Sequence, residues 1–515
     1  MKEIECKIME SRTKNTKRNL ISGLGYQIVS IVLPFIVRTA ILRIMGAQFS
    51  GLTNLFTSIF QVLNLAELGF SSAIIVNMYK PIADNDTEKV CALLNYYRKV
   101  YLLVGLFILV VGLILLPWIP KLIKGEYPES INIYLLYLLY LFNTVISYCL
   151  FEHKNALLIA LQRFDLKNKV YTVTLIIFKL LHLLVIVLTK NVYRYVFLSS
   201  CITITNNIIV QFLTQKHFPQ YSCRGSVDSE DKKKIKKQVT GLMVIRIGDT
   251  ARSSLDSIVI SSCLGLVALT IYSNYYYIFS AVYGFLTVIN NAMLASVGNS
   301  ISEESVDKNY NDLTKFQFIS GGIICACCTC LLCLYQPFMK LWAGEDLMLP
   351  FFEMSLFCVY FFVLNSNNIG EIYFTTNGLW WFTKLYTCIE AMGNLLLNIM
   401  LVKIWGISGI LIATIITLVF LQFIPRTEVL FKEYFKRKPY RYYFATISYG
   451  LVTAVSCFIA YFICIHIPVE GLLCFFVRLL ICALVAPTVY LLFFIKTNTE
   501  KEAISFLKNA FLKSN

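Results

Sequence analysis

The fold of this chain is decided by residues 241–300, which read GLMVIRIGDT ARSSLDSIVI SSCLGLVALT IYSNYYYIFS AVYGFLTVIN NAMLASVGNS. Two hydrophobic runs pass through this stretch, and a short polar break at 261–265 joins them. The first run carries four charged residues, Arg246, Asp249, Arg252 and Asp256. At about 100° per residue these four lie within one helical arc of about 120°. Because a lipid-facing charge near the bilayer centre costs about 2.5–3.5 kcal/mol, we expect this face to line a protein interior or a watery cavity.

The composition of the whole chain supports a membrane location for these runs. Of the 515 residues, 57% are hydrophobic and 15% are charged, and the mean hydropathy is +0.67. A soluble protein of this length could not cover so much apolar surface. Hydrophobic runs of about 20 residues recur along the sequence, which is the pattern of transmembrane helices. We therefore predict an all-α polytopic membrane protein.

The positive charge is distributed as membrane topology requires. The net charge is +16, and most Lys and Arg residues lie in alternate loops between the hydrophobic runs. That distribution orients helices by the positive-inside rule, so we expect no nucleic-acid partner. It places the N-terminal side in the cytoplasm and, with an even number of helices, the C-terminus as well.

About fourteen transmembrane helices are expected. Their ranges are 19–45, 50–78, 96–119, 130–151, 170–189, 194–214, 239–262, 266–295, 316–336, 350–374, 383–403, 407–425, 442–466 and 470–495. The polar break at 215–237 separates two six-helix lobes, predicted over 1–215 and 237–435. Helices 13 and 14 form an appended pair over 441–495, and 496–515 is expected to be a cytoplasmic tail with a short amphipathic helix.

An internal repeat relates the two sets of six helices. Arg38 precedes Gly51 by 13 residues, and Arg252 precedes Gly265 by the same number. The turns after helices 4 and 10 give a second weak match, at an offset of 215 residues. Since six is even, both repeats begin on the same side, which predicts a parallel repeat with its pseudo-two-fold axis along the membrane normal. The repeat also places Arg38 and Arg252 at corresponding positions.

The seventeen cysteines do not predict a disulfide framework. Nearly all of them fall inside apolar runs, and the expected outer loops contain almost none. The densest run lies within a predicted helix and has no nearby histidine; it consists of Cys325, Cys327, Cys328, Cys330 and Cys333. We interpret these residues as reduced packing cysteines and not as a metal site. The sequence predicts no metal and no other cofactor.

Several short patterns in a fixed order resemble a known family. Lys17-Arg18-Asn19, 43–46 and Gly51-Leu52 are similar to the opening of bacterial polysaccharide-repeat-unit flippases of the O-antigen type. The patterns at 256–266, 272–275 and 296–299 resemble their helices 7 and 8. Asn394, Asn398 and 405–409 resemble their helix 11–12 hairpin. These flippases belong to the multidrug/oligosaccharidyl-lipid/polysaccharide exporter superfamily.

The resemblance implies two six-helix lobes around a V-shaped cavity that helices 1 and 7 line, with helices 13 and 14 as a further pair. It implies a flippase in the bacterial cytoplasmic (inner) membrane that moves an undecaprenyl-pyrophosphate-linked oligosaccharide to the outer leaflet by alternating access. Its partners would be that lipid-linked oligosaccharide, the lipid bilayer and a coupling cation, either Na⁺ or H⁺.

A lipid-linked pyrophosphate requires cations in a cavity of low dielectric constant, and arginine suits it because it is always charged and donates bidentately. The candidates are Arg252, Arg246 and Arg38, together with the neighbouring carboxylates Asp249 and Asp256. Two alternatives stay open: Arg252 pairs structurally with these carboxylates, or Arg246 and Arg38 extend their side chains to the membrane interface.

A second set of charged residues falls inside predicted helices and is a candidate for a coupling-ion or proton site. It consists of Glu67, Lys179, His182, Glu371 and Glu390. A titrating histidine could relay protons, and a buried carboxylate could bind a cation. The alternatives are that His182 is a packing residue and that the carboxylates pair with arginines.

Three other functions are considered. A multidrug exporter or a peptidoglycan-precursor flippase of the same fold is the first alternative. A membrane glycan polymerase would need catalytic residues in a substantial outer loop, whereas the expected outer loops are no longer than about 15 residues. The sequence contains no Walker A motif, zinc-ligand spacing or nucleophile elbow, so we expect a transporter and not an enzyme.

Overall fold

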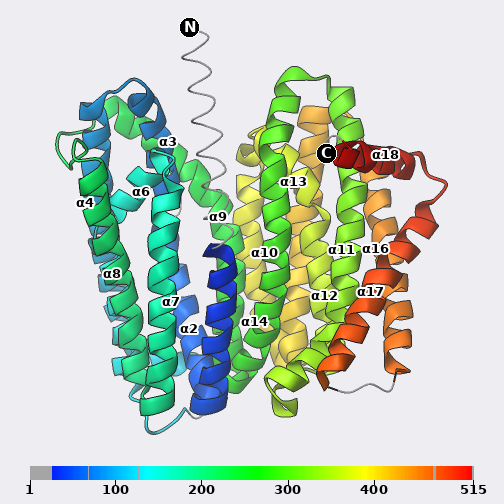
Figure 1. Cartoon of the computed structure of the whole chain (residues 1–515), viewed down its shortest axis with the longest axis horizontal. Coiled ribbons are helices and arrows are strands. Elements are labelled where there is room, and N and C mark those ends of the chain that lie inside the picture. The colour runs from blue at the N-terminus through cyan, green and yellow to red at the C-terminus, as the bar shows by residue number, and fades with distance from the viewer. Residues whose placement is uncertain (1–25, 68, 126, 468–470, 513–515) are drawn as a thin grey trace. The chain divides into compact units, whose positions relative to one another are not determined.

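The computed structural model describes residues 26–67, 69–125, 127–467 and 471–512. Within helices, the side chains at 66, 241–242, 244–251, 253, 292, 295, 380, 472, 498 and 507–512 lie outside the described residues. The described residues form helices joined by turns and contain no strand (Figure 1). The prediction of an all-α chain is confirmed.

The chain divides into two compact units, residues 1–269 and 270–515. The division falls near the start of α10 (Leu266–Glu303). Consequently α9 (Ser229–Leu264), which we expected in the second lobe, groups with the first unit, where it packs against α2 and α3. The lobe boundaries taken from the polar break stay a prediction.

The first unit contains ten further helical segments in the described residues. They are a helix over Tyr26–Met45 that ends in the π-helix η1 (Ile41–Met45), then α2 (Ala47–Leu63), η2 (Asn64–Glu67), α3 (Phe70–Ala83), α4 (Thr87–Leu115), η3 (Leu116–Leu122), α5 (Ile133–Cys149), α6 (Glu152–Ala160), α7 (Phe164–Thr189) and α8 (Val192–His217). The helix expected over 50–78 is broken, because Gly69 adopts a left-handed conformation (φ 90°) before α3.

Polar side chains set several helix starts in this unit. Asp86 begins α4 and Asp228 begins α9, each by accepting a hydrogen bond from the backbone three residues later. Because Asp228 caps α9, this helix begins ten residues before the expected start at 239, and the lysine-rich segment of the polar break is helical. The connection expected after helix 4 likewise contains a helix, α6.

The second unit contains the remaining helices. They are α11 (Val306–Trp342), η4 (Glu345–Leu347), α12 (Phe351–Ser366), α13 (Asn368–Thr376), α14 (Trp380–Thr417), η5 (Leu418–Phe423), α15 (Ile424–Leu430), η6 (Phe431–Phe435), α16 (Tyr440–Ile465), α17 (Gly471–Phe494) and α18 (Asn498–Leu512). α16 and α17 pack against α11 and against each other. α18 is the helix expected in the tail; it also contacts α11, with Phe506 5.5 Å from Phe316 between ring centroids.

α14 contains a reversal of the chain. Gly406 has φ 58° and ψ −133°, values outside the helical region. Asn394 Nδ2 donates to Thr414 Oγ1 and Thr417 Oγ1, both at 3.3 Å. Twenty residues of continuous helix would separate these side chains by about 30 Å, so the two halves of α14 must run antiparallel. This is the hairpin expected between helices 11 and 12.

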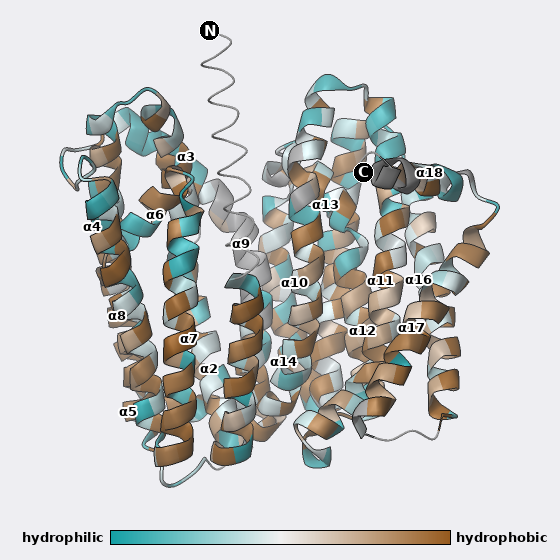
Figure 2. Ribbon diagram, viewed as in Figure 1, coloured by the Kyte–Doolittle hydropathy of each residue, from teal (hydrophilic) through white to brown (hydrophobic). Residues whose placement is uncertain are grey.

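The helices expose apolar side chains and bury polar ones, as lipid-facing helices do. Eight aliphatic residues of α7 are exposed, and Figure 2 shows this helix as largely hydrophobic. In the described residues, nine helices are long and apolar enough to cross a membrane, or ten if the bent pair α5 and α6 counts as one span. The chain is a multi-pass membrane protein; the count of fourteen stays a prediction.

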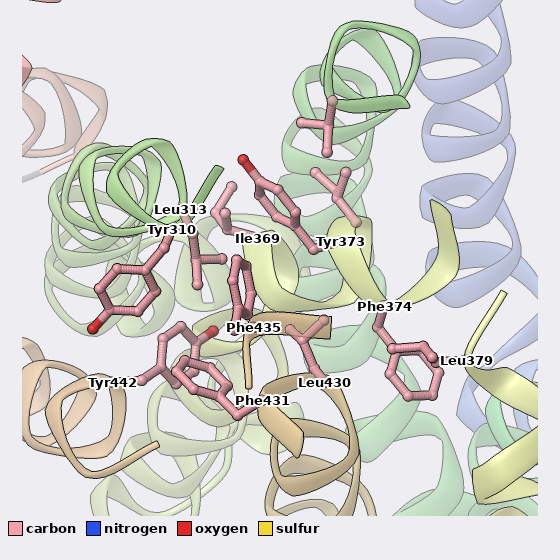
Figure 3. Close-up of a cluster of buried hydrophobic side chains, with 12 residues drawn as sticks. Tyr310, Leu313, Ile369, Tyr373, Phe374, Leu379, Leu430, Phe431, Phe435 and Tyr442 are labelled. Carbon is pink, nitrogen blue, oxygen red and sulfur yellow. The ribbon is translucent and has the colours of Figure 1, made fainter. Parts of the chain in front are cut away.

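An aromatic core holds one end of the second unit together. It joins α11, α13, the α15–η6 segment and α16 through residues that include Tyr310, Tyr373, Phe431, Phe435 and Tyr442 (Figure 3). These rings contact one another at centroid distances between 5.3 and 6.2 Å. Their burial fixes α13, a short helix that lies directly after the break in the tenth predicted span.

The two units share a broken helix, which supports the internal repeat. α5 is followed by the nine-residue helix α6, and α12 is followed by the nine-residue helix α13. Both short helices end at a left-handed residue, Gln162 (φ 56°) in one and Gly378 (φ 67°) in the other. The offset between these residues is 216, one more than the sequence match gave.

The predicted equivalence of Arg38 and Arg252 stays a prediction, and the turns after their two helices do not have the offset of the sequence match. The turn that ends the first helix is at Gly46 (φ 87°, ψ 168°), and the turn that ends α9 is at Gly265 (φ 97°, ψ 178°). Arg38 lies eight residues before its turn, whereas Arg252 lies thirteen before its own. Five residues correspond to about 7.5 Å along a helix. The sequence match had aligned Gly265 with Gly51, which lies inside α2.

Gly51 has a different role, because it allows α2 to approach the beginning of α10. A Cβ atom at this position would lie 2.4 Å from the Leu266 carbonyl oxygen, a backbone atom that cannot rotate away. Gly51→Ala should therefore destabilise the protein by about 1–3 kcal/mol or more, the usual cost of overpacking. The measurement is the midpoint of thermal unfolding in detergent.

Gly284→Ala is the matched control, since Gly284 is also inside a helix and a Cβ there would have no atom within 4 Å. This variant should keep the wild-type midpoint or raise it slightly, because alanine favours helix over glycine. Equal midpoints for the two variants would contradict the close approach.

Candidate functional site

The charged face of α9 is buried where its side chains are described. Arg252 is 4% exposed and Asp256, one turn further along the helix, is 1% exposed. Ser254 between them is fully buried. The other two candidates, Arg246 and Asp249, lie on the same helix, but their side chains fall outside the described residues. A guanidinium and a carboxylate are thus held in the interior of the protein, as the sequence predicted for this face.

Neighbouring elements of the first unit fix the position of this face. Ser254 donates a 3.0 Å hydrogen bond to Gln61 on α2. At the end of α9, the amide of Lys124 donates to the Ser261 carbonyl at 3.0 Å. A Cβ at Gly265 would lie 2.8 Å from the Lys124 carbonyl oxygen, so only glycine fits this turn. The carboxyl end of α9 is therefore held against the segment after η3.

Arg38 has a different environment from Arg252. It lies on the first helix, is half-buried and donates from Nη1 to Asn54 Oδ1 on α2 at 3.4 Å. A hydrogen bond to a neutral amide leaves the positive charge of Arg38 in place.

Glu67 is held by two tyrosines from neighbouring helices. It lies in η2, and its two carboxylate oxygens accept hydrogen bonds from the hydroxyl groups of Tyr101 on α4 and Tyr148 on α5, the second at 2.7 Å. Both tyrosines are buried. The two phenols donate hydrogen bonds to the carboxylate and carry no charge of their own.

His182 has the contacts of a packing residue. Its side chain is fully buried, its ring lies 4.6 Å from that of Tyr195 between centroids, and its Nε2 is 3.1 Å from the Tyr195 carbonyl and 3.2 Å from the Ser199 hydroxyl. Lys179 is half-buried one turn earlier on α7. These contacts fit the alternative of a structural histidine.

Glu371 has an arginine partner. Arg426 Nη1 on α15 lies 2.7 Å from Glu371 Oε1 on α13, and the Arg426 side chain is only 9% exposed. The guanidinium also faces the Phe374 ring, with 5.9 Å between its central carbon and the ring centroid. The pair neutralises both charges and ties α13 to α15, as the arginine-pairing alternative proposed.

Glu390 belongs to a row of buried polar residues on α14. Within residues 381–400, all of which the structure describes, the fully buried residues are Thr383, Thr387, Glu390, Asn394 and Asn398. Their spacings of four, three, four and four residues place them on one stripe of the helix. Asn398 donates to Asn394 at 3.1 Å, and Asn394 reaches across to Thr414 and Thr417. Below we call these seven residues the polar row.

The polar row has the chemistry of a site for a small cation. It offers one carboxylate together with amide and hydroxyl oxygens, the donor types that hard cations prefer. Its burial would exclude most of the water that competes for such an ion. The opposite face of the same helix exposes Leu385, Met392, Leu396 and Met400. The apolar face of this helix is thus exposed, and its polar face is buried within the protein.

The comparisons with known proteins agree with this architecture. The sequence profile of the family described as polysaccharide biosynthesis protein matches residues 16–294, more than half of the chain. The chain belongs to this family. Among curated proteins, none matches the chain.

Solved structures with a similar fold are transporters. The lipid II flippase MurJ in an inward closed conformation superposes with a TM-score of 0.66 at 15% identity, over 92% of this chain and 98% of MurJ. An inward-facing multidrug resistance MATE transporter of the MOP superfamily gives 0.61 at 14% identity, over 79% and 99%. The Vibrio cholerae MATE transporter VcmN, in a mutant form, gives 0.56 at 11% identity, over 83% and 100%. At these identities the likeness shows the fold alone.

A further buried polar cluster surrounds Asn155 on α6, and the sequence did not predict it. Asn155 on α6 donates to Glu152 at 2.9 Å and to the Tyr171 hydroxyl at 3.1 Å, and it lies 3.3 Å from Asn207 on α8. The predicted helices end at 151 and begin again at 170, so the sequence placed Glu152 and Asn155 in a connection. A signal was present, since Glu152 and Asn155 are one turn apart at the end of a predicted span.

The connection between α11 and α12 carries an exposed ion pair. Glu345 lies in η4 and forms an exposed 2.6 Å salt bridge with Lys340. The hydrogen bond from Lys340 lowers the pKa of Glu345, so the carboxylate stays ionised at neutral pH, whereas a general acid needs a raised pKa.

Proposed function

We propose that this protein is a flippase for undecaprenyl-pyrophosphate-linked oligosaccharide repeat units in the bacterial cytoplasmic membrane. It exports them to the outer leaflet by alternating access through a cationic cavity, with both termini in the cytoplasm. The observation that carries the proposal is the buried Arg252 on α9, in a chain of the polysaccharide biosynthesis family with the fold of transporters. Labelling of a cysteine introduced at 228–237, with and without permeabilisation, tests the orientation.

A buried arginine suits the pyrophosphate link that all such substrates share. A phosphate anion loses its hydration when it enters a site of low dielectric constant, and charge-assisted hydrogen bonds from a guanidinium replace that hydration. The planar fork of Arg252 can donate two parallel hydrogen bonds to one phosphate group. Asp256, on the next turn, limits the net positive charge of the site. Arg246, Arg38 and Asp249 are proposed to contribute to the same cavity.

Deletion of the gene should trap lipid-linked repeat units in the inner leaflet, because the polar glycan and the pyrophosphate cannot cross hydrocarbon unaided. The measurement is the amount and sidedness of the lipid-linked pool, together with the surface glycan, with and without the restored gene. Repeat units that reach the outer face and stay unpolymerised would support a polymerase instead.

The same deletion strain distinguishes the two alternatives of the same fold, a peptidoglycan-precursor flippase and a multidrug exporter. If the protein flips a peptidoglycan precursor, deletion of its gene should leave the surface glycan intact and stop cell-wall synthesis. If the deletion strain becomes more susceptible to drugs while its surface glycan and its peptidoglycan stay unchanged, the protein is a multidrug exporter.

Variants of Arg252 test its role directly. Arg252→Ala should insert and accumulate but lose export, and Arg252→Lys should keep only part of it, because lysine keeps the charge and loses the planar fork. The control is Arg252→Ala combined with Asp256→Ala. If Arg252 only neutralises Asp256, the double variant should export normally, since no buried charge is left unpaired. Full export by the double variant, with surface glycan and protein level measured together, would exclude Arg252 as a ligand.

For the coupling cation we propose the polar row, with Glu390 as its charged member. The other oxygen donors, Asn394, Thr414 and Thr417, come from both arms of the hairpin. Binding of Na⁺ or H⁺ to the polar row would therefore change the packing of the two arms of the α14 hairpin against each other. Glu67 is a second proposed site, for a proton in the first unit, whereas Lys179, His182 and Glu371 have contacts that suit a structural role better.

Glu390→Gln should abolish coupling while the protein stays folded, because glutamine keeps the shape and removes the charge. A unit charge at 4 Å contributes about 4 kcal/mol at an effective dielectric constant of about 20, so we expect much more than a tenfold loss of cation affinity. The measurement is substrate transport by reconstituted protein under an imposed Na⁺ gradient and, separately, a pH gradient. Glu353→Gln is the control, since Glu353 on α12 is half-buried and accepts a hydrogen bond from Ser408 outside the polar row. Unchanged gradient dependence in Glu390→Gln would exclude the polar row.

A further inference from the structure

A cluster of thiols lies where α11, α16 and α17 meet. The Sγ atoms of Cys333 on α11, Cys464 on α16 and Cys482 on α17 all lie within 4.8 Å of one another. Each of the three residues is at most 1% exposed. They are far apart in the sequence, and only the packing of the helix pair α16 and α17 on α11 brings them together.

Two further groups complete the surroundings of this thiol triangle. Cys330 lies one turn before Cys333, and its thiol is within hydrogen-bonding reach of Cys482. Arg478 lies one turn before Cys482, and its Nη1 is 3.4 Å from the Cys333 carbonyl. Among the described residues, no Asp or Glu forms a salt bridge with Arg478. A positive charge therefore stands beside thiols in an otherwise apolar junction.

We propose that Cys333, Cys464 and Cys482 form a site for a soft divalent cation of the zinc class. The site is independent of the proposed transport function. Three thiolates from three helices would hold the ion as a clamp that fixes the appended pair α16 and α17 to α11.

The geometry suits such an ion. Sulfur atoms that lie within 4.8 Å of one another are at most about 2.8 Å from the centre of their triangle, and zinc–thiolate bonds are about 2.3 Å long. Each sulfur atom would have to move inward by at most about 0.5 Å, which a change in a side-chain torsion angle can provide.

The charges balance as well. On binding, the three thiols release three protons to water and form three sulfur–metal bonds, with no change in oxidation state. Three thiolates, one divalent cation and the Arg478 guanidinium then sum to zero, which is what burial in an apolar junction requires. A monovalent ion in the same place would leave a net negative charge.

Cadmium is the probe for this site, because its bonds to thiolates give an ultraviolet charge-transfer band. The full-length protein in detergent, treated first with a chelator and a reductant, should bind one Cd²⁺ per chain with this band. The bound ion should raise the midpoint of thermal unfolding, since it binds the folded state. Cys464→Ser should weaken binding by at least about a hundredfold and remove the rise in midpoint, because serine is a poor ligand for soft ions.

Cys327→Ser is the matched control, since Cys327 lies on α11 outside the triangle and is half-buried. It should bind Cd²⁺ as the wild type does. If Cys464→Ser does not accumulate, Cys333→Ser and Cys482→Ser provide the same test. The number of Cd²⁺ ions bound per wild-type chain tests the proposal without any variant. Wild-type protein without the band, or equal binding by wild type and all three serine variants, would overturn the proposal and leave the triangle as packing.

Discussion

Hydrocarbon offers no hydrogen bonds to a side chain or to the backbone, and this constraint arranges most of the chain. α14 shows its effect most clearly, because the row of buried residues on this helix is polar while the opposite face exposes Leu385, Met392 and Leu396. The polar groups then bond to one another, as Asn394 does with Thr414 and Thr417. The hairpin at Gly406 follows from this need, since only an antiparallel neighbour can bring those hydroxyl groups to Asn394. A membrane helix that carries such a row must be paired within the protein.

The buried carboxylates differ in how they are stabilised, and this difference separates structural from functional candidates. Glu371 faces the guanidinium of Arg426, so its charge is compensated and its removal would disturb the contact of α13 with α15. Glu67 instead accepts hydrogen bonds from two neutral phenols. A site that must bind and release a proton or a cation cannot be saturated by a permanent counter-ion. The arrangement around Glu67 meets this requirement, and the arrangement around Glu371 does not.

Hydropathy predicted the helical class and the order of the apolar segments, because burial in lipid depends on local composition. It did not predict events that depend on single backbone angles. The left-handed conformation of Gly69 breaks the second span, and the turn at Gly46 falls five residues before the glycine that the repeat had suggested. The charged face of α9 was predictable because four residues share one helix. The thiol triangle was not, since Cys333, Cys464 and Cys482 are adjacent only after three helices have packed.

The two units keep the same backbone feature and different side chains on it. α6 and α13 have equal lengths, follow a break at the same place and end in left-handed residues. At the offset of 216 residues, Asn155 of α6 corresponds to Glu371 of α13. Asn155 bonds to Glu152 and Tyr171, whereas Glu371 pairs with Arg426. A discontinuous helix exposes backbone groups at membrane depth, and transporters use such breaks to bind substrates or ions. Both units have the break in the backbone, but the polar residues at the two breaks differ. The break is therefore a feature of the shared fold. Any functional difference between the two breaks must come from these side chains.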